Sequence, residues 1–461
     1  MIKQPLVKRA FQAMTVATKT KNDFTTRVLP AKSVHLAFSS KLEQDGFVAT
    51  GSDTEWIKES RAQLRMNNCV GIPTETVYGL AANALDEDAV HSIYRAKSRP
   101  SDNPLIVHVS SIHMLRALYH VPAGGDARRP FLGTDNAESE GLQVDADIQR
   151  KMQQAEQQDI DAGGSGVWPE IPGVYHEVIR RFWPGPLTIV LPRPACIPMA
   201  VLGGHGDTVA FRFPVHPVAR AVISSCGLPL AAPSANASGR PSPTSAAHVL
   251  HDLKGRLPLI VDGGDCDVGV ESTVLDAYSG NAYVDGQLSP CILRPGGVTF
   301  EQLCALGGVW TRTRVYKKDF VNKDLELNPT TPGMKYRHYA PSAPVHLLLP
   351  LAADTRGADA MQSRIDGLAE DIGRSGGGRL GVVAVRASSG SETTFSEPPG
   401  CQLVVHWVDD AKHLAHSIFA LLRSLDEVEH VDAILVEGVE EADEGMAVMN
   451  RLTKAATSPT A

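Results

Sequence analysis

The stretch Gly71-Ile-Pro-Thr-Glu-Thr-Val-Tyr-Gly-Leu80 decides how this chain begins its fold. It places hydroxyls, a carboxylate and a phenol in a turn that follows an apolar strand start. Pro73 fixes the backbone and removes a donor, and the flanking glycines allow close backbone approach. Thr74, Thr76 and Tyr78 offer groups that hold small polar ligands. Taken alone, the pattern fits either a polar pocket wall or an ordinary turn between a strand and a helix.

The next segment adds positive charge beside this turn. Asp86 is a good helix N-cap, and apolar residues at helical spacing after it predict a helix that ends at Lys97. Arg99 follows, and two prolines stiffen the chain before an apolar strand from Leu105 to Val109. Because arginine offers a planar fork and lysine a point charge, the two cations indicate a phosphate site. The alternative is a solvated helix end before an ordinary proline loop.

Later segments repeat one design, in which a short apolar strand ends in polar residues. The alternating strand from Thr208 to Arg212 places both of its end residues and Ala210 on one face. Similar strand ends occur at Ser234-Ala-Asn236, Glu271-Ser272-Thr273 and Arg294-Pro-Gly. Proteins of the α/β class build sites at strand ends, so these segments together predict one shared pocket.

The motifs PTETVYGL, KxRPxxNPL, WPGPLT, SAN, EST and LRPG, in this order, resemble those of the threonylcarbamoyl-AMP synthase family. The resemblance runs from about Thr26 to Pro344 and resumes at Gly445-Met-Ala-Val-Met-Asn-Arg-Leu-Thr-Lys-Ala-Ala456. It implies an α/β fold with two domains. A YrdC-like catalytic domain with a twisted open sheet would precede a smaller, Rossmann-like, parallel α/β C-terminal domain.

The same resemblance implies a nucleotidyltransferase, an L-threonylcarbamoyladenylate synthase. Its substrates would be L-threonine, bicarbonate and ATP, its products threonylcarbamoyl-AMP and pyrophosphate, and Mg²⁺ would accompany the ATP. The product would pass to a tRNA threonylcarbamoyltransferase for tRNA threonylcarbamoyladenosine (t6A) modification. The residues carried over for threonine are Thr74, Thr76, His108, Arg212, Ser234 and Ser272. Those carried over for ATP are Lys97, Arg99, Asn103, Thr208, Asn236, Thr244, Arg294, Tyr336, His338 and Tyr339, with Lys97 and Arg99 also catalytic.

Two functions from other classes stay open on the residues alone. YrdC-like domains present a basic concave face, which suits a non-catalytic module that binds double-stranded RNA or tRNA. A carbamoyl-transfer enzyme of the hydrogenase-maturation type shares the fold, although the acylphosphatase and zinc-finger patterns that accompany it do not occur in this sequence. A P-loop ATPase is excluded, because there is no GxxxxGK[ST] motif.

Composition limits the surroundings in which the chain works. A net charge of −8 argues against tight nonspecific binding of nucleic acid by the whole chain, although a weak local tRNA contact is compatible with it. The seven cysteines are scattered without a CxxC pair, which predicts neither a disulfide framework nor a zinc site and fits a reducing compartment. Since no apolar run approaches about eighteen residues, we expect a soluble protein in the cytoplasm, with mitochondria as a second destination.

The chain divides into four parts on composition. Residues 1–25 form a basic tail, readable as a mitochondrial transit peptide or as a disordered tail. The catalytic domain would span 26–310, interrupted by an acidic, glutamine- and glycine-containing insertion at 123–167 that we expect to be flexible. A linker follows at 311–344, and strands that alternate with helices indicate the C-terminal domain from 345 to 461.

For three groups of histidine and aromatic residues, the sequence allows two different roles. The linker aromatics either form a lid over the nucleotide or anchor the linker to a domain surface. His108 lies inside an apolar strand, where a lone histidine is either a core residue or a ligand contact. His413 and His416 belong to the predicted helix from Ala411 to Val428, and we expect them on its surface, because no third metal ligand is near in sequence.

Overall fold

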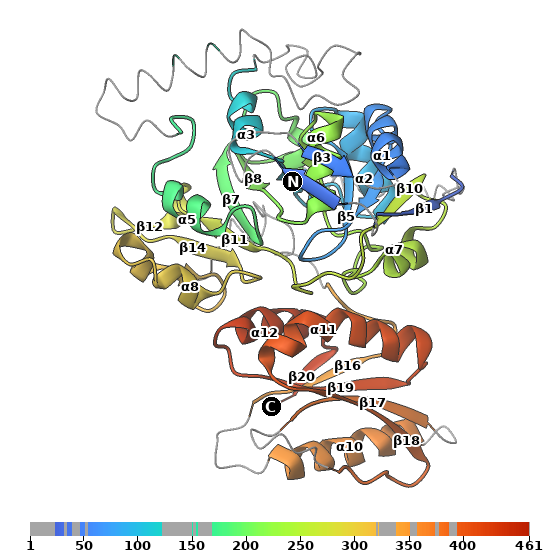
Figure 1. The fold of residues 1–461 in the computed structure, drawn as a ribbon. Coiled ribbons are helices and arrows are strands. Elements are labelled where there is room, and N and C mark those ends of the chain that lie inside the picture. The colour runs from blue at the N-terminus through green and yellow to red at the C-terminus, as the bar shows by residue number, and fades with distance from the viewer. Residues whose placement is uncertain are drawn as a thin grey trace, which may run out of the picture.

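The computed structural model describes residues 24–31, 35–38, 47–50, 54–121, 150, 154, 168–319, 321, 338–350, 357–373, 378–386 and 394–460. The basic tail up to residue 23, nearly all of the predicted insertion, and Tyr336 lie outside the described residues. The described parts form two domains, each an α/β structure with its own sheet, as the sequence predicts (Figure 1).

The strands of the first domain are β1 (Arg27–Pro30), β2 (His35–Phe38), β3 (Phe47–Thr50), β4 (Val70–Ile72), β5 (Gly79–Asn83), β6 (Ile106–His108), β7 (Leu187–Pro192), β8 (Thr208–Arg212), β9 (Leu230–Ala231), β10 (Leu259–Asp262), β11 (Thr273–Asp276), β12 (Tyr283–Val284), β13 (Gln287–Leu288), β14 (Cys291–Arg294) and β15 (Arg314–Val315). Its helices are α1 (Glu55–Arg65), α2 (Glu87–Lys97), α3 (Ile112–Leu118), α5 (Tyr175–Phe182), α6 (Pro217–Cys226), α7 (Ala246–Leu253) and α8 (Phe300–Cys304).

The C-terminal domain contains β16 (Val345–Leu348), α10 (Gly357–Gly373), β17 (Gly378–Val385), β18 (Cys401–Val408), α11 (Ala411–Arg423), β19 (Ala433–Glu437), α12 (Glu444–Ala455) and β20 (Ser458–Thr460). Its strands lie in the order β18-β17-β19-β16-β20, and every pairing is parallel. Helices α11 and α12 lie between this sheet and the first domain, while α10 covers the opposite face (Figure 1). The predicted helix from Ala411 stays α-helical to Arg423 and continues as a π-helical turn to Val428.

The large sheet of the first domain brings the sequence motifs to one place. Its strands follow the order β1-β10-β4-β5-β9-β6-β8-β7-β11-β14-β15, with parallel and antiparallel pairs mixed. The strand that ends at His108 lies parallel to the strand that ends at Arg212, and these two residues are register partners. The arginine is also paired with Thr188 of the neighbouring strand β7. Motifs far apart in sequence therefore end side by side at one edge.

Helix α2 delivers Lys97 to that edge, as the spacing predicts. The carboxylate of Asp86 accepts a hydrogen bond from the Ala89 backbone N–H at 3.0 Å and so caps the first turn. Val90 and Ile93 are fully buried on the inner face. The helix stops because Ser98 adopts a left-handed conformation with φ of 52°.

The sheet of the first domain continues past the predicted boundary at residue 310. Strand β15 lies after that boundary and is only two residues long, and it pairs in parallel with β14. Trp310 is 2% exposed and belongs to the main hydrophobic core, as does Val315. A strand this short has no alternating pattern to read, so the sequence placed the start of the linker too early.

The two domains share a hydrophobic cluster. Val77 of the first-domain turn, Val270 and Tyr339 are buried together with apolar residues of α11, including Phe419. Among the described residues, no helix is both long and apolar enough to cross a membrane. All seven cysteines are free thiols, as their scattered positions predict.

Candidate active site

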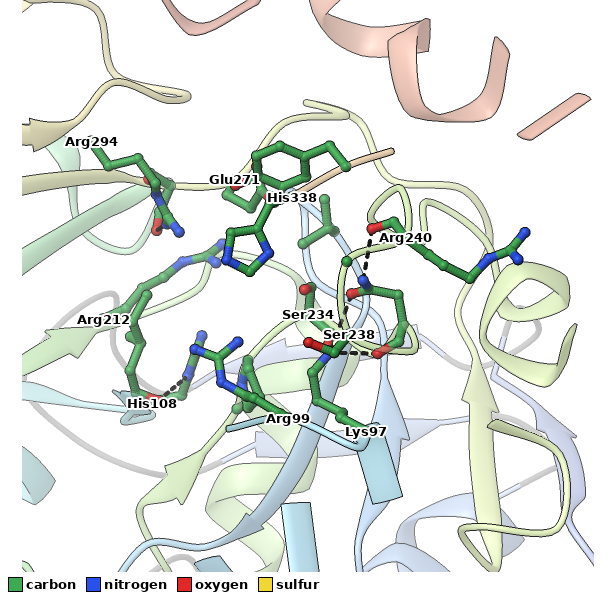
Figure 2. A pocket seen from close by; sticks show the side chains of 18 residues that line it. Lys97, Arg99, His108, Arg212, Ser234, Ser238, Arg240, Glu271, Arg294 and His338 are labelled. Carbon is green, nitrogen blue, oxygen red and sulfur yellow. Dashed lines mark hydrogen bonds between the residues drawn. The ribbon is translucent and has the colours of Figure 1, made fainter. Parts of the chain in front are cut away.

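A pocket opens at the edge of the large sheet, on the side that faces the C-terminal domain. It contains about 630 Å³ of empty space, part of it open to solvent. Figure 2 shows its labelled cations arranged around this space, with His338 between them. The lining residues are Val77, Lys97, Arg99, Ile106, His108, Arg212, Ala232, Pro233, Ser234, Asn236, Ser238, Gly239, Arg240, Glu271, Ser272, Arg294, His338 and Tyr339.

Lys97 holds the loop that carries the SAN motif. Its ammonium group donates to the backbone oxygen of Ser234, and to the backbone oxygen of Asn236 at 2.6 Å and its side-chain oxygen at 3.3 Å. Burial lowers the pKa of Lys97 well below its ordinary value, and the nearby charge of Arg99 lowers it further. Lys97 thus acts on the pocket by fixing a loop as well as by its charge.

Arg99 reaches the pocket from the loop after α2 and Arg294 from the end of β14, and both are anchored to carbonyl groups. Arg99 donates to the Pro104 oxygen at 3.1 Å, and burial lowers its pKa to about 10. Arg294 donates to the Ser272 backbone oxygen at 2.9 Å and to its hydroxyl at 3.2 Å. The Pro104 and Ser272 oxygens are neutral partners, so the two guanidinium groups give this part of the pocket a positive charge that attracts anions.

Arg212 is paired within the protein, which the sequence did not predict. Its Nη2 donates to the Glu75 carboxylate at 2.6 Å, and both side chains are 4% exposed. The Nε of Arg212 is buried without a hydrogen-bond partner among the described residues, although the side chain lines the pocket. One edge of this guanidinium therefore serves the fold.

His108 lines the pocket as a neutral imidazole. Burial and the charge of Arg212 lower its pKa to about 3. Its Nδ1 lies 3.2 Å from the backbone oxygen of Ile106. His108 is 3% exposed within its strand, as a core residue would be, and it also contributes to the pocket wall, so a ligand contact stays a prediction.

Five predicted site residues do not line this pocket. Thr74 and Thr76 turn inward, their hydroxyls 2.9 Å apart, and Thr74 also donates to the Val77 oxygen at 2.6 Å, so they hold the turn closed. The Thr244 hydroxyl lies 3.4 Å from Nδ1 of His248. The remaining two, Asn103 and Thr208, are buried away from the lining.

The structure also adds lining residues that the sequence reasoning passed over. They are Val77, Ile106, Ala232, Pro233, Ser238, Gly239, Arg240 and Glu271. Glu271 is the first residue of the EST motif, so the sequence could have indicated it as a lining residue. The apolar lining residues have no functional group that would mark them in the sequence. Arg240 points away from the pocket centre (Figure 2), and its Nη2 binds the Glu427 carboxylate of the C-terminal domain at 2.5 Å.

The end of the linker closes the pocket on the side of the C-terminal domain. His338 and Tyr339 are lining residues, and the next residue, Ala340, donates its N–H to the Gly239 oxygen at 2.9 Å. The ring of Tyr339 lies 5.2 Å from that of Phe419 on α11. The described part of the linker is therefore both a pocket wall and a segment anchored to the second domain.

No metal site is supported by the histidines of α11. The Nδ1 of His413 lies 3.2 Å from Asp409, and that of His416 lies 2.8 Å from the Asp267 oxygen, both at the helix surface as predicted. Among the described residues, the carboxylates close enough to share an ion are those of Asp252 and Glu427, beside His251. Both also form ion pairs with Arg423, through Oδ2 of Asp252 and Oε1 of Glu427.

Comparisons with known proteins identify the family of this chain. A family model described as "Telomere recombination" matches residues 62–128 and 162–296, and one described as "Threonylcarbamoyl-AMP synthase, C-terminal domain" matches residues 298–457. A threonylcarbamoyl-AMP synthase of Schizosaccharomyces pombe is 41% identical over 88% of this chain and 90% of its own length. A protein of the same name from Bacillus subtilis is 38% identical over 87% of this chain and 92% of its own length.

A solved structure matches both domains. The crystal structure of Pyrococcus abyssi Sua5 complexed with L-threonine has a TM-score of 0.65 and 34% identity, and the match covers 93% of this chain and 97% of that one. Neither the RNA-binding module nor the hydrogenase-maturation enzyme is favoured, because relatives across most of the length are synthases. The chain therefore belongs to the threonylcarbamoyl-AMP synthase family, whose members are enzymes that transfer an adenylyl group from ATP.

Proposed function

We propose that the pocket joins L-threonine, bicarbonate and ATP into threonylcarbamoyl-AMP and pyrophosphate. One observation carries this assignment: Lys97, Arg99, Arg212 and Arg294 converge, all but Arg99 less than 9% exposed, on a pocket that has apolar residues beside it. Buried cations are costly unless a ligand or partner neutralises them. Glu75 already neutralises Arg212 and Glu271 lies near Arg294, and a polyanion with a small zwitterion beside it would neutralise the positive charge that remains.

The reaction needs little covalent help from the protein. The threonine amine and bicarbonate form a carbamate with loss of water. An oxygen of the carbamate then attacks the α-phosphorus, and the bond to the bridging oxygen of pyrophosphate breaks. In such substitutions the enzyme contributes positioning and charge neutralisation. Arg99 and Arg294 would neutralise the phosphates, while the loop held by Lys97 would position the nucleotide.

Threonine would lie near the glutamate-bound arginine. Arg212 keeps Glu75 on one edge, and its Nε would donate to the threonine carboxylate. The Ser272 hydroxyl lies 2.7 Å from that of Thr188 and accepts a hydrogen bond from Arg294, and Ser272 would be a second polar contact for threonine. His108, being neutral, would contribute a hydrogen bond without a second charge.

Magnesium would enter as a companion of the triphosphate. The lining carboxylate, Glu271, accepts from Ser242 at 2.7 Å and pairs with Arg451 at 3.0 Å. Glu75 is occupied by Arg212 in the same way. Mg²⁺ prefers oxygen ligands and keeps several waters, so the phosphates suit it better than these paired carboxylates. When bound, the ion would neutralise part of the phosphate charge.

The wider role follows from the family. We propose that the product passes to a tRNA threonylcarbamoyltransferase, which uses it for t6A modification. The mixed anhydride hydrolyses easily, so a wall formed by His338 and Tyr339 would protect it from water before transfer. The compartment, cytoplasm with or without mitochondria, stays a prediction.

Incubation of the purified protein with ATP, threonine and labelled bicarbonate tests the assignment. We expect the label in a threonylcarbamoyl adenylate and one pyrophosphate for each adenylate formed. Omission of threonine is the control, because pyrophosphate released without it would indicate simple ATP hydrolysis. A protein that binds tRNA but releases no pyrophosphate would support the RNA-binding alternative and refute the proposal.

A further inference from the structure

Helix α12 of the C-terminal domain contacts segments that form the pocket wall, although the proposed function assigns it no role. Its residue Arg451 has a side chain that is 1% exposed. The Nε of Arg451 donates to Oε2 of Glu271 at 3.0 Å, and its Nη1 donates to the backbone oxygen of Pro295. A single guanidinium of the C-terminal domain therefore touches two segments of the first domain.

These two segments are in direct backbone contact with each other. The N–H of Gly297 donates to the Glu271 oxygen at 3.1 Å. A Cβ added at Gly296 would lie only 2.2 Å from that same oxygen, so the approach depends on glycine. One segment carries Ser272 and the other carries Arg294. Arg451 thus fixes the spacing between two residues that line the pocket.

Arg451 also neutralises a negative charge in the pocket wall. Burial alone would raise the pKa of Glu271, but Arg451 and Arg294 outweigh it and lower that pKa to about 2. Glu271 is therefore ionised throughout the physiological range. Without Arg451 this carboxylate would repel anionic ligands and would draw Arg294 toward itself.

The third contact of Arg451 is with the linker. Its guanidinium carbon lies 5.9 Å from the ring centroid of Tyr339, within the range of a cation–π interaction. Tyr339 itself lines the pocket. Arg451 is therefore in contact with three separate segments of the wall, although it is not itself a lining residue.

We propose that Arg451 is a positioning residue of the active site, by which the C-terminal domain holds Glu271, Ser272, Arg294 and Tyr339 in a geometry that accepts anionic substrates. The inference rests on the proposed function for the nature of those substrates. It differs from simple domain docking, because it requires that ligand binding, and not only stability, depends on Arg451.

Arg423 offers a matched control for docking. Its side chain is also 1% exposed, and it crosses the same interface to pair with Asp252 at 2.8 Å. It donates to the Pro241 oxygen at 2.6 Å as well. Neither Asp252 nor Pro241 lines the pocket. Loss of Arg423 should therefore weaken the interface with much less effect on the lining.

The experiment measures the melting temperature and the kinetics of full-length variants. We expect Arg451→Met to raise the KM for both threonine and ATP about tenfold or more, with a smaller change in kcat. Adding Glu271→Gln to that variant should recover most of the loss, because it removes the unpaired carboxylate. Arg423→Met should lower the melting temperature by a similar amount and change both KM values by about threefold at most.

Arg451→Lys is a second variant that keeps the proposal testable if Arg451→Met does not fold. Lysine keeps the charge but cannot reach the carboxylate and the carbonyl together, so we expect a folded enzyme with an intermediate rise in KM. Wild-type KM values in the lysine variant, or an equal rise in Arg423→Met, would overturn the positioning role. An inactive wild type would instead refute the proposed function, and the positioning role would then be judged by ATP dissociation constants from titration.

Discussion

At the scale of single residues, the pocket depends on cations that donate hydrogen bonds to neutral oxygens. Lys97, Arg99 and Arg294 are tied mainly to carbonyl oxygens, which orient the charges without cancelling them. Burying such groups costs free energy that folding alone does not return. This cost marks the cluster as a place where an anionic ligand belongs.

Replacing Lys97 or Arg99 by alanine should depress synthesis strongly while the fold persists. Losing one charge-assisted contact removes roughly 1.5–3 kcal/mol, or about ten- to a hundredfold in rate. The control is Arg95→Ala, which removes an exposed cation from the same helix. Steady-state pyrophosphate release would decide the matter, and near wild-type turnover in both variants would contradict the assignment.

The preference for threonine over serine should depend on apolar side chains that contact the threonine methyl group. Val77, Ile106 and Ala232 supply apolar wall beside the proposed threonine site. A pocket that contacts one methyl group provides about 1–3 kcal/mol, so kcat/KM for serine should be about tenfold to two-hundredfold lower. L-allo-threonine, which has the same methyl group in the opposite configuration, is the control. Equal values for serine and threonine would show that no methyl contact exists.

At the scale of elements, the end of the linker keeps its conformation only through contacts with both domains. Tyr339 adopts a φ of 70°, which is uncommon for a residue other than glycine and costs free energy. Its ring packs on α11, and the following N–H is bonded to Gly239. The segment therefore keeps its conformation through both domains, in agreement with a wall that excludes water.

The variant Tyr339→Ala should weaken nucleotide binding and shorten the lifetime of the adenylate, because it removes the ring from the wall. Tyr339→Phe keeps the ring and removes only the hydroxyl, so it should retain most of the affinity. We would measure ATP affinity by titration and adenylate loss by quenched time courses. If the alanine variant binds ATP and protects the adenylate as well as the wild type, the wall function is wrong.

At the scale of the whole molecule, buried ion pairs hold the domains together. The pairs Arg451–Glu271 and Arg423–Asp252 both cross the interface. Removing one partner of such a pair is strongly destabilising, because the other charge stays buried and unpaired. The shared apolar cluster around Val77 and Phe419 adds to this contact. Some residues, such as Glu271 and Tyr339, therefore belong both to the pocket wall and to the domain interface.

Acid should weaken this interface in a defined window. The pKa of Glu271 falls from its ordinary value of 4.5 to about 2 in the folded protein, so its contribution to stability is complete above pH 4.5 and is lost as the pH falls toward 2. A shift of that size is equivalent to about 3 kcal/mol. Urea unfolding at several pH values would measure the loss. Glu271→Gln should show a flatter acid limb, and an unchanged slope would contradict the pairing.

The local elements and the family could be predicted from the sequence alone. Asp86 and the spacing after it fixed helix α2, and alternation fixed the strand that ends at Arg212. These signals lie within a few neighbouring residues, where helical or strand periodicity can be read directly. The ordered motifs likewise identified most of the cations that line the pocket.

The way in which those residues are used depends on contacts between distant parts of the chain. Glu75 and Arg212 are 137 residues apart and Glu271 and Arg451 are 180 apart, so no local pattern records either pairing. For the same reason the sequence did not show that Thr74 and Thr76 turn inward to close their own turn. Pairing partners are selected by burial, since a charged group that leaves water must meet whichever opposite charge the fold brings to it.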